Sequence, residues 1–292
     1  MKIYPARTKI LVLGATGMLG NAMLRVLANS PGFDVVGSAR SSSALHLLPE
    51  ALRARVRTGV DVENADALAR LFDTVRPKTV INCVGVVKQL ADADDPLIAL
   101  PINALLPHRL SRLCALIGAR LVHFSTDCVF AGTRGLYAET DTPDAQDLYG
   151  RSKLLGEVVS EAHAVTLRTS IVGHELASSH GLVDWFLSEV GSVRGYAKAV
   201  FSGLPTVELA NIVRDYVLPE TALTGLYQVS AAPIDKLTLL RLLATQYGLA
   251  TEIVPDDRVV IDRSLDSTRF RAITGYDPPA WPELVRRMHA FG

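Results

Sequence analysis

Two side chains in the middle of the chain have the types and the spacing needed for proton transfer. Tyr149 and Lys153 stand four positions apart, so a helix places both on one face. A lysine ammonium near a phenol favours the phenolate and lowers its pKa from about 10, which prepares the tyrosine to exchange a proton with an alcohol or ketone oxygen. Such a pair also arises by chance on a solvated helix face, so its meaning depends on its surroundings.

Three polar residues upstream of this pair follow a run of apolar residues. Ser125, Thr126 and Asp127 lie at the carboxyl end of a predicted strand at 120–125. Doubly wound sheets hold their ligands at this end of the strands. We therefore expect Thr126 to hydrogen-bond a reacting carbonyl, with Ser125 and Asp127 beside the substrate. Without the other motifs, an equally good interpretation is that these residues only terminate the strand.

A glycine-rich segment near the start of the chain has the spacing of a nucleotide-binding loop. It forms a Gly-x-x-Gly-x-x-Gly pattern between an apolar strand-like run and an amphipathic segment. Such a loop lets the backbone approach a pyrophosphate, and the helix that follows directs free amide groups and its positive dipole end at that charge. A tight turn without a ligand is the alternative, but the flanking elements favour a dinucleotide site. The expected contacts are Gly14, Thr16, Gly17, Met18, Leu19 and Gly20.

The second predicted strand carries the signal for the type of dinucleotide. An acid at its carboxyl end would accept hydrogen bonds from the ribose of NAD. Asp34 lies at the amino end instead, well over ~10 Å from the ribose at roughly 3.3 Å per residue. Arg40 follows the carboxyl end, where it can make a bidentate contact with a 2′-phosphate, unless it is only a solvated loop charge. NADPH is therefore favoured over NADH, which is not excluded.

Two further loops are expected to border the adenosine half of the cofactor. Asp61 and Val62 follow the third predicted strand, where an acid can bind the adenine amino group. Asp61 is equally well placed to cap the helix that starts near Asn64. The turn after the fourth strand, made of Cys83, Val84 and Gly85, is expected beside the adenine ribose.

Short β-branched runs alternate with helical stretches through the first half of the chain. This pattern predicts an α/β fold with a doubly wound parallel sheet of the Rossmann type. After about residue 173 the alternation of strands and helices becomes less regular. We therefore expect a dinucleotide-binding domain over 1–172 and a smaller C-terminal substrate lobe over 173–292, with a return of the chain to the sheet at about 204–230. The expected strands are 9–13, 34–37, 55–59, 79–84, 120–125, 164–168 and 225–230, and the helices are 18–29, 64–75, 101–117 and 148–162.

Composition excludes several classes of protein. Of the 292 residues 49% are hydrophobic and 21% are charged, as in an ordinary globular protein. The 30 basic residues balance the 30 acidic ones, so the protein has no net positive charge that would attract nucleic acid. No apolar run approaches the roughly 20 residues of a membrane helix, and no signal peptide precedes the glycine loop, so we expect a soluble, cytoplasmic protein. Three cysteines without metal-ligand spacing predict neither a disulfide frame nor a metal site. The oligomeric state stays open, with a homodimer as one option.

These motifs together resemble the extended short-chain dehydrogenase/reductases, most closely the dTDP-4-dehydrorhamnose reductase branch. The resemblance implies a catalytic Thr126, Tyr149 and Lys153, with Lys153 also holding the nicotinamide ribose. It further implies that Tyr149 protonates a keto oxygen, at C4 of a nucleotide-activated deoxy sugar, as hydride arrives from NADPH. The matching segments are Gly14-Ala-Thr-Gly-Met-Leu-Gly20, Phe124-Ser-Thr-Asp-Cys-Val-Phe-Ala-Gly132, Glu139-Thr-Asp-Thr-Pro143, Tyr149-Gly-Arg-Ser-Lys-Leu-Leu-Gly-Glu157, Leu167-Arg-Thr-Ser170, Leu204-Pro-Thr206, Gly225-Leu-Tyr227 and, more weakly, Arg263-Ser-Leu-Asp-Ser-Thr-Arg-Phe270.

The chain departs from that branch in the segments 84–90 and 173–194, which would line the sugar site. The identity of the sugar therefore stays open. Lys88 and Arg263 are candidates for contact with the phosphates of a nucleotide sugar, or are surface charges.

Two alternatives remain besides a reductase. Dehydratases of the extended family carry an Asp-Glu pair after the catalytic threonine, whereas here Cys128 follows Asp127. This difference argues against elimination and less strongly against a nucleotide-sugar epimerase. A non-catalytic regulatory subunit that keeps the NADP site is the second alternative, but such a subunit would not need the intact Thr126, Tyr149 and Lys153.

Overall fold

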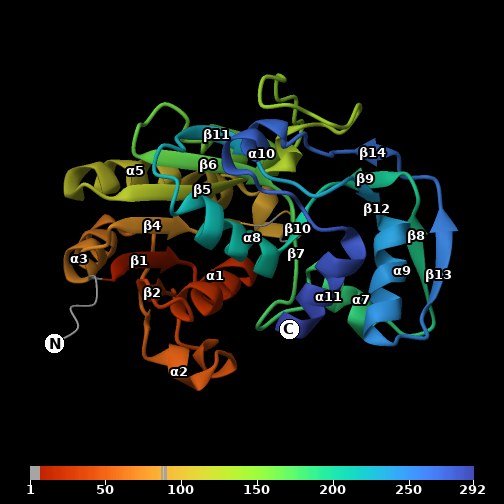
Figure 1. Ribbon diagram of the computed structural model, residues 1–292, viewed down its shortest axis with the longest axis horizontal. Coiled ribbons are helices and arrows are strands. Elements are labelled where there is room, and N and C mark those ends of the chain that lie inside the picture. The colour runs from red at the N-terminus through yellow and green to blue at the C-terminus, as the bar shows by residue number, and fades with distance from the viewer. Residues whose placement is uncertain (1–6, 87, 89–90) are drawn as a thin grey trace.

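The computed structural model describes residues 7–86, 88 and 91–292, and its centre is a seven-stranded parallel sheet (Figure 1). The strand order is β11-β6-β5-β4-β1-β2-β3. All neighbours run parallel, and the order reverses beside β1, so the predicted doubly wound α/β fold is confirmed. The strands are β1 (Thr8–Leu13), β2 (Phe33–Ser38), β3 (Val56–Arg57), β4 (Thr79–Asn82), β5 (Arg120–Thr126), β6 (Ala164–Thr169) and β11 (Gly225–Gln228).

Helices cover both faces of this sheet because side chains alternate along each buried strand. In β1, Ile10 and Val12 join one core with α1 (Met18–Ala28) and α8 (Thr206–Ile212). Leu11 and Leu13 join the opposite core with α3 (Ala65–Val75) and α5 (Leu106–Ile117). The strand is therefore apolar at every one of these positions.

Two helices differ from their expected bounds. The helix expected at 148–162 is α6 (Leu148–Leu155), which has Gly156 as its C-cap and is followed by Glu157, the partner of Arg168 in β6. The helix expected at 101–117 is preceded by α4 (Pro96–Ala99) and a π-helical turn, Leu100–Leu105, before α5 begins. The wide turn carries the buried Asn103, whose side chain binds the backbone of Val86. At both places the chain makes buried contacts with segments that are distant in the sequence.

After β6 the chain builds a second lobe, which lies on the right of the sheet in Figure 1. It then returns to the sheet through α8 and β11, which pairs with β6, and leaves again. The strands outside the central sheet are β7 (Ile171–Val172), β8 (Ser192–Tyr196), β9 (Ala199–Phe201), β10 (Leu204–Pro205), β12 (Ile234–Asp235), β13 (Glu252–Asp256) and β14 (Ile261–Asp262). The remaining helices are α2 (Glu50–Arg53), α7 (Leu182–Ser188), α9 (Lys236–Tyr247), α10 (Thr268–Thr274) and α11 (Trp281–Phe291).

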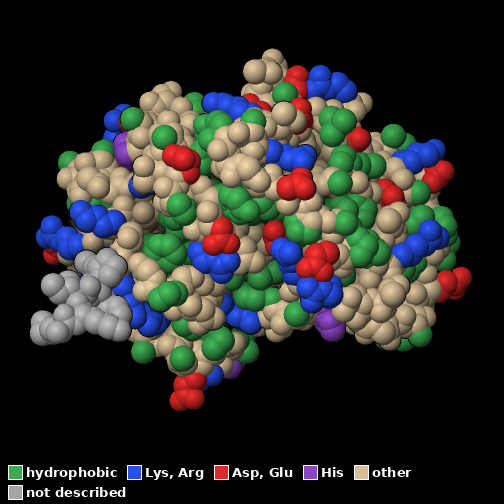
Figure 2. Space-filling model, in the orientation of Figure 1, with side chains coloured by type: hydrophobic (Ala, Val, Ile, Leu, Met, Phe, Trp, Pro, Cys, Tyr) green, Lys and Arg blue, Asp and Glu red, His purple; other side chains and the backbone are tan. Residues whose placement is uncertain are grey.

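The surface agrees with the balanced composition. On the face shown in Figure 2, acidic and basic side chains of the described residues are intermingled and form no extended basic area. Among the helices in the described ranges, none is both long and apolar enough to span a bilayer.

Candidate active site

A cavity of about 300 Å³ lies at the carboxyl ends of β1, β2 and β4. It brings together nine of the residues predicted to bind a dinucleotide. These are Gly14, Thr16, Gly17, Arg40, Asp61, Val62, Cys83, Val84 and Gly85. Ile98 and Ile102 add an apolar wall that the sequence did not indicate, because only the fold brings the segment from α4 to α5 over the loop after β4.

The other three residues of the glycine segment serve the packing of α1. Leu19 is buried in the core, and neither it nor Met18 nor Gly20 lines the cavity. A Cβ atom at Gly20 would lie 2.0 Å from the carbonyl oxygen of Gly14, so only glycine allows this approach of helix and loop. Their contact with a cofactor remains a prediction.

The side chains at the adenosine end are placed as the strand arithmetic predicted. Arg40 is exposed at the cavity rim just beyond β2, whereas Asp34 lies at the start of β2 and faces Lys9 and Arg55. Asn64, and not Asp61, caps α3, because its side chain accepts a hydrogen bond from the amide of Ala67. Asp61 is therefore free of the capping role and lines the cavity.

The candidate proton donor lies where α6 meets the end of β5. Asp147 caps α6 by accepting a hydrogen bond of 2.7 Å from the amide of Gly150. A Cβ atom at Gly150 would lie 2.2 Å from the carbonyl oxygen of Cys128, so glycine lets this turn approach the segment after β5. Tyr149 thereby comes within reach of Thr126, the last residue of β5.

The pKa of Tyr149 differs from the sequence expectation. Burial and the neighbouring Cys128 raise it above its usual value of 10, and the hydrogen bond with Thr126 only partly opposes this. Burial thus outweighs the lowering expected from Lys153, whose ammonium donates a hydrogen bond of 2.7 Å to the carbonyl oxygen of Phe124. The phenol is therefore held protonated, which suits a proton donor.

Lys153 lies between the other candidate catalytic residues and the cavity. Its buried ammonium lies near Gly85, where an added Cβ would be 4.0 Å from Nζ. Burial lowers the pKa of Lys153 to about 8, although the charge of Glu157 opposes the shift. The lysine thus lies between the cavity and the Tyr149 helix.

Ser125 does not share the environment of Thr126. Its hydroxyl donates a hydrogen bond of 2.7 Å to Glu157, which also forms a bidentate ion pair with Arg168 at 2.7 and 2.8 Å. All three residues are buried. This network joins β5, β6 and the end of α6, so it fits a structural role for Ser125 better than the expected contact with substrate.

Residues from the second lobe approach Asp127. Arg263 donates a hydrogen bond of 2.8 Å to the carbonyl oxygen of Phe130, and its charge acts on Asp127. The charge of Lys236, at the start of α9, also acts on Asp127, and no motif in the sequence indicated this lysine. Lys88 instead forms an ion pair of 2.5 Å with Asp147, so it secures the loop after β4 to α6.

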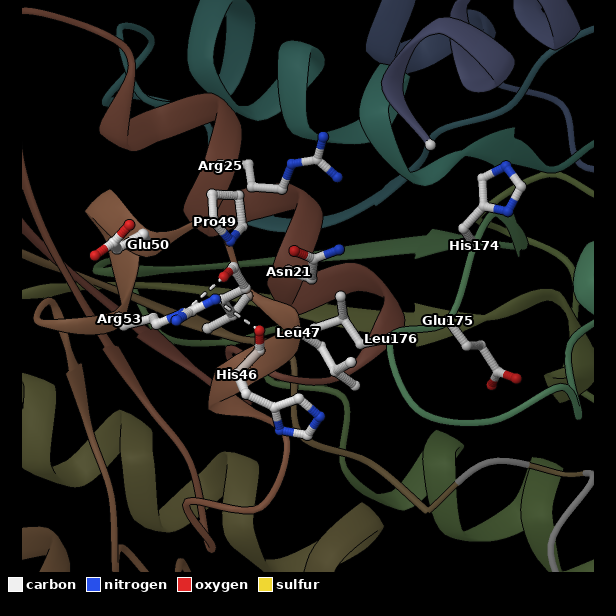
Figure 3. A pocket seen from close by; sticks show the side chains of 12 residues that line it. Asn21, Arg25, His46, Leu47, Pro49, Glu50, Arg53, His174, Glu175 and Leu176 are labelled. Atoms are coloured by element: carbon white, nitrogen blue, oxygen red, sulfur yellow. Dashed lines mark hydrogen bonds between the residues drawn. The ribbon is translucent and has the colours of Figure 1, made fainter.

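A second cavity, of about 450 Å³, lies beside α1 and α2 (Figure 3). Its side chains do not converge on one point: Glu50 and Arg53 point away from Glu175 and His174 across it. Arg53 donates to the backbone carbonyls of His46 and Leu48, and His174 is bonded to Asp184 and Tyr247. We therefore assign the chemistry to the strand ends.

The family model described as the RmlD substrate binding domain matches residues 8–230, which is most of the chain. The chain belongs to this family. The RmlD match includes the glycine loop and all three candidate catalytic residues, and it ends just after β11.

The alignments with named relatives cover less of this RmlD family member than the family model does. A protein of Haloferax volcanii named "Probable low-salt glycan biosynthesis reductase Agl14" is 34% identical over 165 residues, which are 55% of this chain and 52% of the relative. A dTDP-4-dehydrorhamnose reductase of Mycobacterium tuberculosis is 30% identical over 204 residues, covering 63% and 60%. The chain thus matches between half and two thirds of the length of these relatives.

A solved structure from Sulfolobus tokodaii extends the likeness to nearly the whole chain. It is described as a hypothetical dTDP-4-dehydrorhamnose reductase and superposes with a TM-score of 0.77 at 25% identity. The superposition covers 94% of this chain and 98% of that chain, so it includes the second lobe.

Proposed function

We propose that this protein is an NADPH-dependent reductase of a keto group, at C4, on a nucleotide-activated deoxy sugar. The observation that carries the proposal is the convergence of Thr126, Tyr149 and Lys153 at the end of β5, directly beside the dinucleotide cavity. The named reductases among the relatives support the same reaction class.

The residues that line the cavity support a dinucleotide phosphate as its ligand. The glycine loop leaves backbone space beside the start of α1, where amide groups and the helix dipole favour a pyrophosphate. Arg40 at the rim is free to bind a 2′-phosphate, and Asp61 and Val62 lie on the wall expected to face the adenine. When bound, NADPH supplies the hydride.

The chain's own residues supply the proton and the alignment. Tyr149 keeps its proton at neutral pH and can give it to a keto oxygen that becomes an alkoxide. Thr126, whose hydroxyl donates to Asp127 in this structure, can turn to donate to the same oxygen, which would fix its position. Lys153 adds a positive charge beneath the site and stabilises the negative charge that develops there.

The experiment that tests the proposal measures NADPH oxidation with a panel of 4-keto-6-deoxy sugar nucleotides. We expect one NADPH consumed for each product molecule, and deuterium on the transferred hydride should appear at the former keto carbon. A 6-hydroxylated sugar nucleotide should stay intact. Product formed with catalytic cofactor and no net oxidation would overturn the reductase proposal, because the hydride would then return to the cofactor as an epimerase or dehydratase requires.

Three further predictions accompany this function. We propose that 173–292, apart from the return at 204–230, forms the sugar-binding lobe, since Arg263 and Lys236 come from it. A cytoplasmic location and a homodimer remain predictions from the sequence. Light scattering on the purified protein measures the oligomeric state.

A further inference from the structure

Glu157 has a buried carboxylate whose two oxygens both accept hydrogen bonds. Oε1 accepts bonds of 2.7 Å from the hydroxyl of Ser125 and from Nε of Arg168. Oε2 accepts a bond of 2.8 Å from Nη2 of Arg168. Three donors from two neighbouring strands therefore fix the orientation of this carboxylate.

A glycine allows the packing that places Glu157 at this position. Gly156 is the C-cap of α6, and a Cβ atom there would lie 2.0 Å from the carbonyl oxygen of Asn103. Any side chain at 156 would push the end of α6 away from the π-helical turn at Leu100–Leu105. The position of Glu157 is therefore set by the packing of α6 as well as by its ion pair.

The ion pair contacts the chain on both sides of Thr126. Ser125, which precedes Thr126, donates to Glu157. Phe130 follows Thr126 by four positions, and its ring centre lies 5.3 Å from Cζ of Arg168, within the range of a cation–π contact. The pair therefore holds both the end of β5 and the segment that follows it.

The last turn of α6 makes a second contact with the same strand. Lys153, four positions before Glu157, donates a hydrogen bond of 2.7 Å to the carbonyl oxygen of Phe124. Phe124 and Ser125 are consecutive residues of β5, so side chains from the end of α6 bind two successive positions of the strand. A shift of α6 along β5 would therefore move Tyr149, which lies on the same helix, relative to the strand end.

The energetics of a buried ion pair favour a role in geometry over a role in stability. Desolvation of two charges costs about as much as their attraction returns, so an apolar pair of similar volume is often at least as stable. Loss of one partner alone is costly because it leaves the other charge uncompensated. What the pair of Glu157 and Arg168 supplies is a fixed direction, because two parallel charge-assisted hydrogen bonds join the two planar groups.

We propose that Glu157 is a positioning residue for the reduction. With Arg168 it fixes the strand end that carries Thr126, so that the threonine hydroxyl and the phenol of Tyr149 meet at the keto oxygen. Glu157 acts through Ser125, and it is not among the described residues that line the dinucleotide cavity. The proposal rests on the reductase function given above. A misplacement of about 1 Å is enough to lower kcat by about 100-fold, so a contact behind the site can control the rate.

The test compares Ser125→Ala with the matched control Thr166→Val. Ser125→Ala removes the link between β5 and Glu157 and leaves the ion pair with Arg168 in place. Thr166 is fully buried on β6 and donates a hydrogen bond of 2.9 Å to the carbonyl oxygen of Val158, so Thr166→Val deletes a similar contact beside the network. Both variants should lower the Tm, since each loses a buried hydrogen bond.

The two variants should differ in their kinetics. We expect Ser125→Ala to lower kcat by at least about tenfold with the Kd for NADPH unchanged, and Thr166→Val to keep kcat within about twofold. Glu157→Gln should also lower kcat. Combined with Ser125→Ala it should lower kcat by less than the product of the two single effects, because both changes act on one contact. Ser125→Ala alone decides the inference if Glu157→Gln does not fold.

A second measurement needs no turnover, so it separates this inference from the reductase proposal. The amide of Cys128 donates a hydrogen bond of 3.1 Å to the hydroxyl of Thr126, so exchange of this amide reports on the strand end. Hydrogen exchange over 124–129, measured by NMR with NADP+ present, should be at least about tenfold faster in Ser125→Ala than in Thr166→Val. Such a difference in a protein that oxidises no NADPH would contradict only the reductase proposal.

Three results would overturn the positioning role. The first is an unchanged kcat in Ser125→Ala, and the second is an equal fall of kcat in Thr166→Val, which would show that lost stability causes the effect. The third is equal exchange over 124–129 in the two variants, because the contact with Glu157 would then not hold the end of β5.

Discussion

Lys153 donates a hydrogen bond of 2.7 Å to the carbonyl oxygen of Phe124, two residues before Thr126. This contact joins α6 to β5 and holds the ammonium beneath the candidate catalytic residues. The lysine is therefore both a structural link and a charge, and Tyr149 is the group that we propose exchanges the proton.

The first prediction separates these two roles. Tyr149→Phe should lower kcat by at least about 100-fold, because a general acid is lost, while the Kd for NADPH stays unchanged. Lys153→Met should weaken both kcat and NADPH binding, since the lysine lies beside the cofactor cavity as well. Steady-state kinetics and fluorescence titration measure the two effects. Full activity in Tyr149→Phe would remove the tyrosine from the mechanism.

The second prediction concerns the choice of cofactor. Arg40 is the exposed cation at the end of β2, so the protein should bind NADPH more tightly than NADH by about 10- to 100-fold, as one charge-assisted bidentate contact allows. Arg40→Ala should erase most of the difference. Arg70→Ala, on the exposed side of α3, is the matched control and should keep it. Equal affinity of the unaltered protein for both cofactors would contradict the assignment.

The third prediction concerns the buried network behind the site. Glu157→Gln removes the carboxylate from a bidentate pair whose side chains are only 5% and 4% exposed, leaving Arg168 charged and uncompensated. We expect the free energy of unfolding to fall by about 3–5 kcal/mol. Glu161→Gln, which breaks a more exposed pair with Arg112, should cost no more than about 1 kcal/mol. Urea denaturation of both variants measures whether the buried pair contributes more to the free energy of unfolding than the exposed pair does.

The fourth prediction is a dependence of stability on pH. Burial, with the charges of Lys153 and His108, lowers the pKa of His123 well below 6.5, so this histidine is neutral in the folded protein. The unfolded chain takes up a proton at His123 near pH 6.5 and the folded protein does not. The free energy of unfolding should therefore fall as the pH drops below 6.5, with a contribution from His123 of up to about 1.4 kcal/mol per pH unit.

His123→Gln keeps a polar group that can reach Asn82, the partner of His123 at 3.1 Å, and should make the pH dependence shallower. His46→Gln changes an exposed histidine and is the control. Urea denaturation at pH 7.5 and 5.5 measures the slope. Parallel slopes for the unaltered protein and His123→Gln would show that another group causes the pH dependence.

The sequence alone determined the features that depend on neighbours along the chain. A four-residue spacing places Tyr149 and Lys153 on one helix face whatever the rest of the fold, and alternation along β1 requires apolar residues for both cores. The position of Arg40 beyond β2 follows from strand length. These local rules were enough to predict the parallel sheet, and they brought together residues that line one cavity.

The tertiary structure alone decided which distant side chains meet. The charge of Lys236 acts on Asp127 because the fold places the start of α9 near the end of β5, and no spacing in the sequence encodes that placement. Glu157 pairs with Arg168 because the fold places the end of α6 beside β6. The pKa of Tyr149 rises because packing removes water from the phenol, which outweighs the effect expected from a lysine four residues away. Burial and long-range charge are properties of the packed chain, and they set the chemistry of a site whose residues the local pattern had already identified.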